Sequence, residues 1–265
     1  MKRRAFFQNA AMAGIAAGAL IRSAAGDDKS GPREFYELRV YTLKEKDDAQ
    51  RKLVDDYLEK AFIPAMNRLG SAAVGVFSEQ KPGAPVYVLI PYASLEQYLK
   101  ANEALLSDGE YIKAGADYLT IEMPNKAYER IDSSLLQALE GHPKMVIPAQ
   151  AKEKKPHIVQ LRIYESPSET AGKKKIEMFN KGEIDAFKRS GTNPVFFSET
   201  IIGGKRPCLT YMLSFDDKAA QAKAWGVFVN DPDFKRMIGM KEYSDKMIVS
   251  HINNTILTAA AYSQI

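Results

Sequence analysis

The sequence predicts an α+β protein in which two tandem βαββαβ halves pack sheet to sheet as a pseudo-dimeric α/β barrel. Three observations predict this architecture. The chain contains one long internal repeat, each copy shows the same order of strand-like and helix-like patterns, and the first strand of each copy carries large side chains on both faces. A sheet with two occupied faces needs helices on one side and a second layer on the other.

The repeat consists of four short blocks that recur in the same order at nearly constant spacing. The matched blocks are 38–41 with 161–164 and 108–111 with 231–234, both 123 positions apart, 77–79 with 197–199 at 120, and 133–136 with 254–257 at 121. A period this long indicates duplicated domains, since solenoid repeats are far shorter.

The second copy shows its elements more clearly than the first. Alternating apolar residues predict a strand over 158–164, and a stripe that includes Phe179 and Phe187 predicts a helix over 168–190. The remaining expected elements are strands at 194–199 and 209–215 around a Gly203-Gly204 turn, helices capped by Asp216 and started by Pro232, and a last strand at 252–262. The Ala259–Ala261 end of that strand is equally compatible with a helix.

The first copy follows the same plan. The expected elements are a strand at 35–43, a helix at 47–69 kinked by Pro64, strands at 73–79 and 86–92, helices within 94–118 and a strand at 129–137. These patterns divide the chain into a domain at 33–140, a proline- and lysine-containing linker at 141–156, and a domain at 157–265.

A βαββαβ order is the ferredoxin-like arrangement, with helices over one face of an antiparallel sheet. Behind Val159, Leu161 and Ile163 lie the polar-tipped Gln160, Arg162 and Tyr164, and the first copy has Glu37, Arg39 and Tyr41 in the same places. We expect the polar-tipped face to line a partly polar barrel interior, which would bury Arg162 and Tyr164. The alternative is that this face is solvated.

Residues 1–26 resemble a twin-arginine signal peptide. A basic start with Arg3-Arg4 is followed by an apolar run of about 12 residues, too short for a membrane span, and by small residues at 23–25. An amphipathic helix is the alternative. We expect a periplasmic or secreted protein without a membrane anchor after cleavage.

Charge and cysteine content exclude two classes of protein. Residues 1–26 contain four basic residues and no acidic one, and the whole chain has a formal net charge of +4, so the remainder is formally neutral. A nucleic-acid partner is therefore not expected. The single cysteine, Cys208, excludes an internal disulfide.

Four blocks resemble a bacterial branch of the NIPSNAP family. They are Met-Phe-Asn-Lys-Gly-Glu at 178–183, Asn-Pro-Val-Phe-Phe-Ser-Glu at 193–199, Leu-Thr-Tyr-Met-Leu at 209–213 and Ala-Tyr-Ser-Gln-Ile at 261–265. The first half is looser, with Ala-Val-Gly-Val-Phe at 73–77. The resemblance implies the dimeric α/β-barrel fold shared by cofactor-free monooxygenases, isomerase-like enzymes and haem proteins. It implies no single reaction.

Familiar catalytic motifs are absent from the sequence. It contains no G-x-G-x-x-G, no P-loop, no G-x-S-x-G and no C-x-x-C, and its three histidines lack metal-ligand spacing. We therefore predict no metal and no cofactor.

The best polar cluster lies in the second half. Glu199 and His251 are candidate proton-transfer residues. The candidate ligand-binding residues are Arg162, Tyr164, Asn180, Glu183, Asn193 and Tyr211. Gly182 within a helix indicates close packing or a ligand approach. The alternative is that Asn180 and Glu183 fix the helix to a loop and that Glu199 is a solvated strand end.

Two classes of function remain. One is a small-molecule binding protein, a class that includes enzymes of the cofactor-free oxygenase or isomerase type. The other is a non-catalytic interaction module whose barrel is only a core. A cavity with converging polar groups would favour the first, and a filled interior would favour the second. The ligand, the reaction and any homo-oligomer stay open at this point.

Overall fold

The computed structural model describes residues 31–44 and 47–265, so the predicted signal peptide at 1–26 lies outside the described residues. The first half runs β1 (Phe35–Thr42), α1 (Asp48–Tyr57), η1 (Leu58–Phe62), α2 (Ile63–Arg68), β2 (Gly75–Ser78), β3 (Val86–Tyr92), α3 (Leu95–Leu106), α4 (Gly109–Ala114), α5 (Ala116–Leu119) and β4 (Arg130–Ala138). A short helix, α6 (Ala149–Lys152), follows in the connection.

The second half repeats this order, with extra short helices before its last strand. It runs β5 (Ile158–Glu165), α7 (Glu169–Met178), η2 (Phe179–Glu183), α8 (Ile184–Arg189), β6 (Pro194–Ile202), β7 (Cys208–Phe215), α9 (Lys218–Phe228), α10 (Pro232–Ile238), η3 (Lys241–Tyr243), α11 (Asp245–Ile248) and β8 (His251–Ala259). The predicted α+β class and the tandem βαββαβ plan are confirmed.

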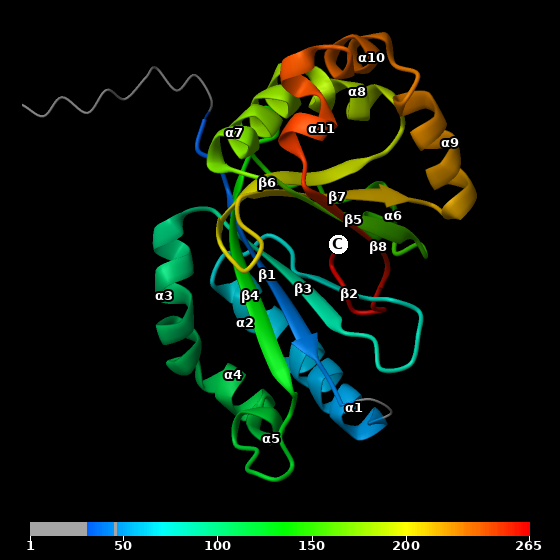
Figure 1. Ribbon diagram of the computed structural model, residues 1–265. Helices are drawn as coiled ribbons and strands as arrows, with labels where there is room; N and C mark the ends of the chain where they lie inside the picture. Colours follow the sequence, from blue (N-terminus) through cyan, green and yellow to red (C-terminus); the bar gives the residue numbers. More distant parts are fainter. Residues whose placement is uncertain (1–30, 45–46) are drawn as a thin grey trace, which may run out of the picture.

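The eight strands form one closed antiparallel barrel in the order β1-β3-β2-β8-β5-β7-β6-β4. Each half contributes four neighbouring strands, and the halves join where β2 pairs with β8 and β4 pairs with β6. Figure 1 shows the helices of the first half on one side of the barrel and those of the second half on the opposite side. Closure leaves neither sheet with an unpaired edge.

Side-chain caps begin most of the longer helices. Ser94 accepts a hydrogen bond from the backbone of Gln97, and Asp231 accepts two at the start of α10, where Pro232 occupies the first turn as predicted. The predicted cap Asp216 is wrong by one residue. Asp217 accepts from the Ala220 backbone instead.

The helical segment that follows the first strand of each half contains one π turn, η1 in the first half and η2 in the second. Pro64 follows η1 as expected for a kink, but the second half forms the same turn with Asp185 in that place, so proline is not its only cause. A Cβ on Gly182 would lie 3.2 Å from the Met237 sulfur, which confirms the close packing inferred for this glycine.

The predicted orientation of the first strands is wrong. The apolar side chains of β5 face into the barrel, where residues of all eight strands form one buried cluster that includes Leu38, Leu161, Phe196, Met212 and Leu257. The polar-tipped side chains face the helices instead, since Tyr164 packs with Phe179 and Phe187 and Tyr41 packs with the helices of the first half. The barrel interior is therefore apolar, and the polar groups lie between the sheet and the helices.

One block of the repeat is also displaced by one residue. Phe77 pairs with Tyr87 and lies inside the barrel, whereas Phe197 pairs with Tyr211 and faces the helices. The structural equivalent of Phe77 is Ser198, at a spacing of 121, because a slip of one residue in a strand reverses the face of every side chain.

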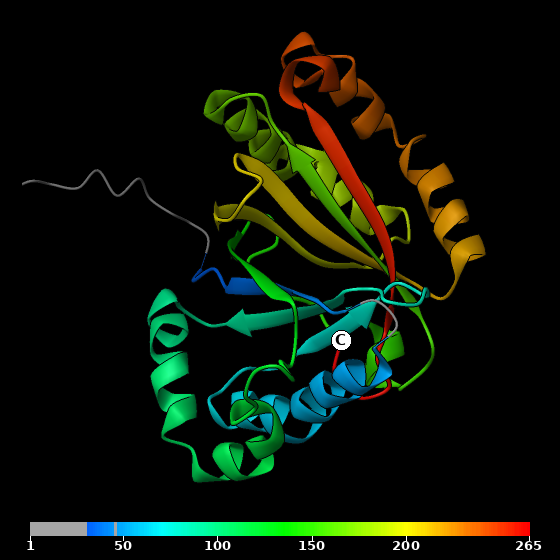
Figure 2. The ribbon, with the colours of Figure 1, turned by 60° about the horizontal axis from the view of Figure 1, so that its bottom comes forward.

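The C-terminal residues join the two halves. The Gln264 backbone N–H donates to Val74 O, Tyr262 Oη donates to Asp55, and Ile265 is fully buried within the barrel cluster. In both ribbon views the C-terminus lies beside β2 of the first half (Figure 2). Within 31–44 and 47–265, no helix combines the length and the apolar character that crossing a membrane requires.

Candidate functional site

Four of the predicted site residues meet beneath the helices of the second half. Arg162 and Tyr164 on β5, Tyr211 on β7 and Glu183 on η2 surround the same buried volume. Tyr211 Oη donates to Tyr164 Oη at 3.1 Å, and the Arg162 Cζ lies 5.1 Å from the centre of the Tyr164 ring. Burial raises the pKa values of both tyrosines, so both stay protonated at neutral pH.

The buried partner of Glu183 is Lys175, which the sequence analysis missed. Lys175 Nζ lies 3.4 Å from Glu183 and 3.3 Å from Asp245. Burial raises the pKa of Glu183 against the opposing charge of Lys175. The signal was present in the spacing, because Lys175, Phe179 and Glu183 recur every four residues on one helix face and Phe179 belongs to the core.

The other four predicted site residues lie apart from this cluster. Asn180 accepts a hydrogen bond from the Gly141 backbone, Asn193 is an exposed turn residue with φ 43°, Glu199 pairs with the exposed Lys173, and His251 is exposed at the start of β8. The proposed proton-transfer pair, Glu199 and His251, is therefore not assembled with Glu183 and Tyr211.

Trp225 on α9 fills the space over Arg162. Its ring centre lies 4.7 Å from the Arg162 Cζ, and its Nε1 donates to Gln160 Oε1 at 2.7 Å. Trp225 also packs against Phe228, and Phe228 packs against Phe234 at the start of α10. These aromatic rings thus cover the polar groups of the second half on the side of α9, while Arg162 stays partly exposed beside β8.

The first half carries a buried ion pair on the equivalent strand. Arg39 Nε and Nη2 donate to the two oxygens of Glu37 at 2.7 and 2.8 Å, in a bidentate arrangement. Tyr92 and Ser133 donate further hydrogen bonds to the same carboxylate at 3.2 and 2.6 Å. Glu37 is only 5% exposed, so this network forms the floor between sheet and helices.

Electrostatics keep this floor ionised. Burial alone would raise the pKa of Glu37, but the hydrogen bonds and charge of Arg39, with Ser133 and Tyr92, hold it below its usual value. The pKa of Arg39 is raised by Glu37 in spite of burial. Burial also raises the pKa values of Tyr92 and Tyr98. At neutral pH the floor is a neutral ion pair beside two protonated phenols.

A cleft of about 230 Å³ opens above this ion pair. We name it the α3 cleft. Its lining residues are Glu37, Arg39, Tyr92, Tyr98, Leu99, Ala101 and Asn102. The α3 and α9 caps, Ser94 and Asp217, lie 123 positions apart, so Asn102 occupies the position of Trp225. The short Asn102 side chain leaves open the space that the indole fills in the second half.

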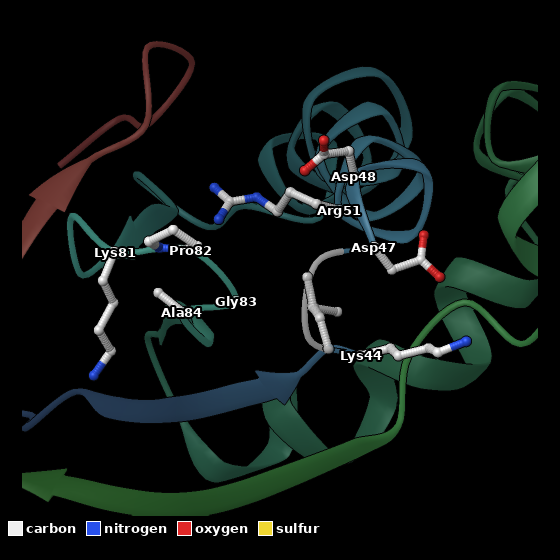
Figure 3. A pocket seen from close by; sticks show the side chains of 9 residues that line it. Lys44, Asp47, Asp48, Arg51, Lys81, Pro82, Gly83 and Ala84 are labelled. Atoms are coloured by element: carbon white, nitrogen blue, oxygen red, sulfur yellow. The ribbon is translucent and has the colours of Figure 1, made fainter.

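Another cleft, of about 440 Å³, lies between the loop at Lys81–Ala84 and the start of α1 (Figure 3). Its Arg51 is paired with Asp55, and it borders residues 45–46, which lie outside the described residues. We do not assign a site there. No group of three His, Cys, Asp or Glu side chains within 31–44 and 47–265 is arranged to hold a metal ion.

Comparison with known proteins identifies the repeat. The family model NIPSNAP matches residues 36–140 and again 159–264. A proposed monooxygenase from Fusobacterium nucleatum has a similar structure, with 9% identity over 86% of this chain and 92% of that chain and a TM-score of 0.55. A proposed monooxygenase from Lactobacillus acidophilus is also similar, with 9% identity over 86% of this chain and 93% of that chain and a TM-score of 0.56.

A NIPSNAP-like domain protein from Burkholderia xenovorans matches about one half of the barrel, with 16% identity over 38% of this chain and 83% of that chain and a TM-score of 0.34. No curated protein sequence matches this chain. At 9% identity, the two longer likenesses show that the whole-chain fold recurs in other bacterial proteins, and they carry no information on the reaction.

Proposed function

This chain belongs to the NIPSNAP family, and we propose that it binds a small, uncharged organic molecule in the α3 cleft of its first half. The observation that carries the proposal is the meeting of an open cleft with a buried, fully engaged ion pair at Glu37 and Arg39. Concave sites with a few converging polar groups are the usual form of ligand pockets.

The size of the cleft limits the ligand. A volume of about 230 Å³ equals that of roughly eight water molecules at ~30 Å³ each. This is below the usual range for drug-sized ligands and suits a compound with one ring. The Tyr92 and Tyr98 rings, which meet edge to face at 5.3 Å, and the Leu99 side chain provide apolar walls.

The charges of the floor favour a neutral ligand. An anion drawn to Arg39 would meet the Glu37 carboxylate, and a cation would meet the guanidinium. Arg39 uses Nε and Nη2 for Glu37, which leaves Nη1 as the guanidinium nitrogen that this carboxylate does not occupy, with the Tyr41 hydroxyl nearby. A carbonyl or hydroxyl oxygen of the ligand would accept from this nitrogen, and Asn102 would supply both a donor and an acceptor.

The enzymatic form of this proposal is a cofactor-free oxygenase- or isomerase-type reaction on the molecule held in the cleft. The Arg39 guanidinium would then stabilise negative charge on a substrate oxygen. Two proteins with this fold are described as proposed monooxygenases, a description that belongs to them. We also propose export through the twin-arginine pathway, which N-terminal sequencing of the periplasmic protein would test.

The test compares the protein with its Asn102→Trp variant by ligand-observed NMR, using the neutral probes benzamide, phenol and benzyl alcohol and the charged probes benzoate and benzylamine. We expect a neutral probe to bind the natural chain, and binding to be lost when the indole fills the cleft. Glu103→Trp is the matched control, because it places the same ring on the same helix outside the cleft.

Binding of no neutral probe, or binding that survives Asn102→Trp, would contradict the proposal. Circular dichroism of both variants shows whether each is folded. Failure of all neutral probes would favour the non-catalytic interaction module.

A further inference from the structure

We infer that the second half carries a separate anion site at Arg162, which takes the carboxylate of a small organic acid. This site lies in the second half of the barrel, whereas the α3 cleft lies in the first half. It would select an anion, whereas the α3 cleft would select a neutral molecule. The inference therefore goes beyond the proposed function and does not depend on it.

The first argument is that the Arg162 donors are not engaged by the protein. Among residues 31–44 and 47–265, Arg162 Nε is one of the few buried side-chain nitrogens without a hydrogen-bond partner. No carboxylate of the described residues lies within 4.0 Å of its guanidinium, whereas other basic residues, such as Lys175 and Arg189, have a carboxylate within that distance. A buried donor left unpaired destabilises the fold, and a bound acceptor would remove this cost.

The second argument comes from the equivalent residue in the first half. Arg39 is neutralised by Glu37, whereas the position of Glu37 is occupied by Gln160 in the second half. The Gln160 oxygen accepts from Trp225, and its amide nitrogen donates to Asn254 at 2.7 Å. Gln160 therefore offers Arg162 no charge, and its side chain is directed to Trp225 and Asn254.

The third argument is the local balance of charge. Arg162 Cζ and Lys175 Nζ each lie 5.1 Å from the centre of the Tyr164 ring, so two cations flank one phenol. The acids near them, Glu183 and Asp245, are both in contact with Lys175. Lys175 thus has its own counter-charges, and Arg162 is the cation that lacks one among the described residues.

The fourth argument is access. Arg162 is only partly buried, and Asn254, which pairs with it on β8, is exposed on the same face of the sheet. The neighbouring Ile252 on that face is 39% exposed. A planar carboxylate reaching Arg162 from this side would find a bidentate donor, the Asn254 amide and the edge of the Trp225 ring.

Trp225 makes the site directly observable, because it is the only tryptophan in the chain and lies against the Arg162 guanidinium. The experiment titrates the mature chain with benzoate and with benzamide, which match in shape and differ in charge, while Trp225 emission is recorded. We expect a saturable change with benzoate and none with benzamide. Added sodium chloride should weaken the benzoate response, as for any ion pair that retains contact with solvent.

Two variants test the assignment. Arg162→Gln should remove the benzoate response. Gln160→Glu should remove it as well while preserving the fold, because it gives Arg162 the internal carboxylate that Glu37 provides to Arg39. Gln80→Glu, which adds the same charge in an exposed loop of the first half, should leave the response unchanged.

The inference is overturned if benzoate gives no saturable change, if benzamide gives the same change, or if the response survives Gln160→Glu. If Arg162→Gln fails to fold, the Gln160→Glu result still decides. Failure here leaves the α3 cleft proposal intact, since that proposal is tested with neutral probes and with a variant of the first half.

Discussion

In the first half, α3 places the short Asn102 over the sheet and a cleft opens on the Glu37–Arg39 ion pair, whereas in the second half α9 places Trp225 over Arg162 and the same space is filled. The backbone plan, the caps and the π turns are shared. The cleft therefore depends on the side chain at the Asn102 and Trp225 position and not on the order of strands, although the second half adds short helices before β8. A duplicated barrel can keep its shape through one half while the other acquires a pocket.

The charges of the two halves differ in a corresponding way. The first half places its acid on the strand, as Glu37, directly beside the arginine. The second half places its acid on the helix, as Glu183, at the position held by Phe62 in the first half, and provides Lys175 for it. Both arginines thus lie against aromatic rings, but only Arg39 is also paired with a carboxylate among the described residues.

The largest effect that would separate the halves is expected from Trp225→Asn. Removing the partly buried indole, which packs against Phe187, Phe228 and Arg162, should cost about 3–4 kcal/mol of unfolding free energy, near the lower end of the range for aromatic truncations. Asn102→Trp should cost less than about 1 kcal/mol, because its ring enters existing space. Urea denaturation measures both, and equal losses would mean that the two positions do not differ in packing.

A smaller difference in stability is expected from exchanging the residue types of Glu37 and Gln160, which occupy equivalent strand positions. Glu37→Gln should destabilise the protein by about 3 kcal/mol, because it leaves Arg39 buried without its counter-charge. Gln160→Glu should change stability by less than about 1 kcal/mol, since the new carboxylate gains Arg162 and can still accept from Trp225, but loses the hydrogen bond that the Gln160 amide donates to Asn254. A large loss from Gln160→Glu and none from Glu37→Gln would reverse our description of the two arginines.

The smallest expected effect is the pH dependence, which should have opposite signs in the two halves. The folded-state pKa of Glu37 is lowered, so its contribution to stability is present above its ordinary pKa of 4.5 and is lost as the pH falls through the folded value. The folded-state pKa of Glu183 is raised by burial, so its ionisation opposes folding and acidification relieves this cost.

Unfolding free energies of the natural chain, Glu37→Gln and Glu183→Gln, measured from neutral pH to about pH 3, check this prediction. The unfolding free energy of the natural chain minus that of Glu37→Gln should become smaller on acidification. The unfolding free energy of the natural chain minus that of Glu183→Gln should become larger, and each difference should change by on the order of 1 kcal/mol. Parallel changes in the two comparisons would rule out opposite pKa shifts.

The sequence predicted the order of elements because periodicity and caps are local signals. It did not predict which face of β5 meets the helices, because both faces of this strand are covered. Arg162 and Tyr164 are polar at their ends but pack against aromatic rings, and the alternation of polar and apolar residues does not show such contacts. Lys175 was hidden in the run Lys173–Lys175, of which only this residue is fully buried.

The repeat held more information than the block matches used. When the segments 123 positions apart and the segments 121 positions apart are aligned separately, Asn102 falls on Trp225 at a spacing of 123 and Phe62 falls on Glu183 at a spacing of 121. The alignment of the short Asn102 with a tryptophan in the other copy of the repeat is the signal that could have located the cleft. Its volume could not have been predicted, because it depends on how the Tyr92 and Tyr98 rings pack beside Asn102.

The most direct test of the central claim is a crystal structure of the protein soaked with benzamide. Our account predicts electron density for one molecule in the α3 cleft, with its carbonyl oxygen near Arg39 and its ring against Tyr92 and Tyr98, and none beside Trp225. An empty α3 cleft, or benzamide bound at Arg162 instead, would contradict the assignment of the open site to the first half.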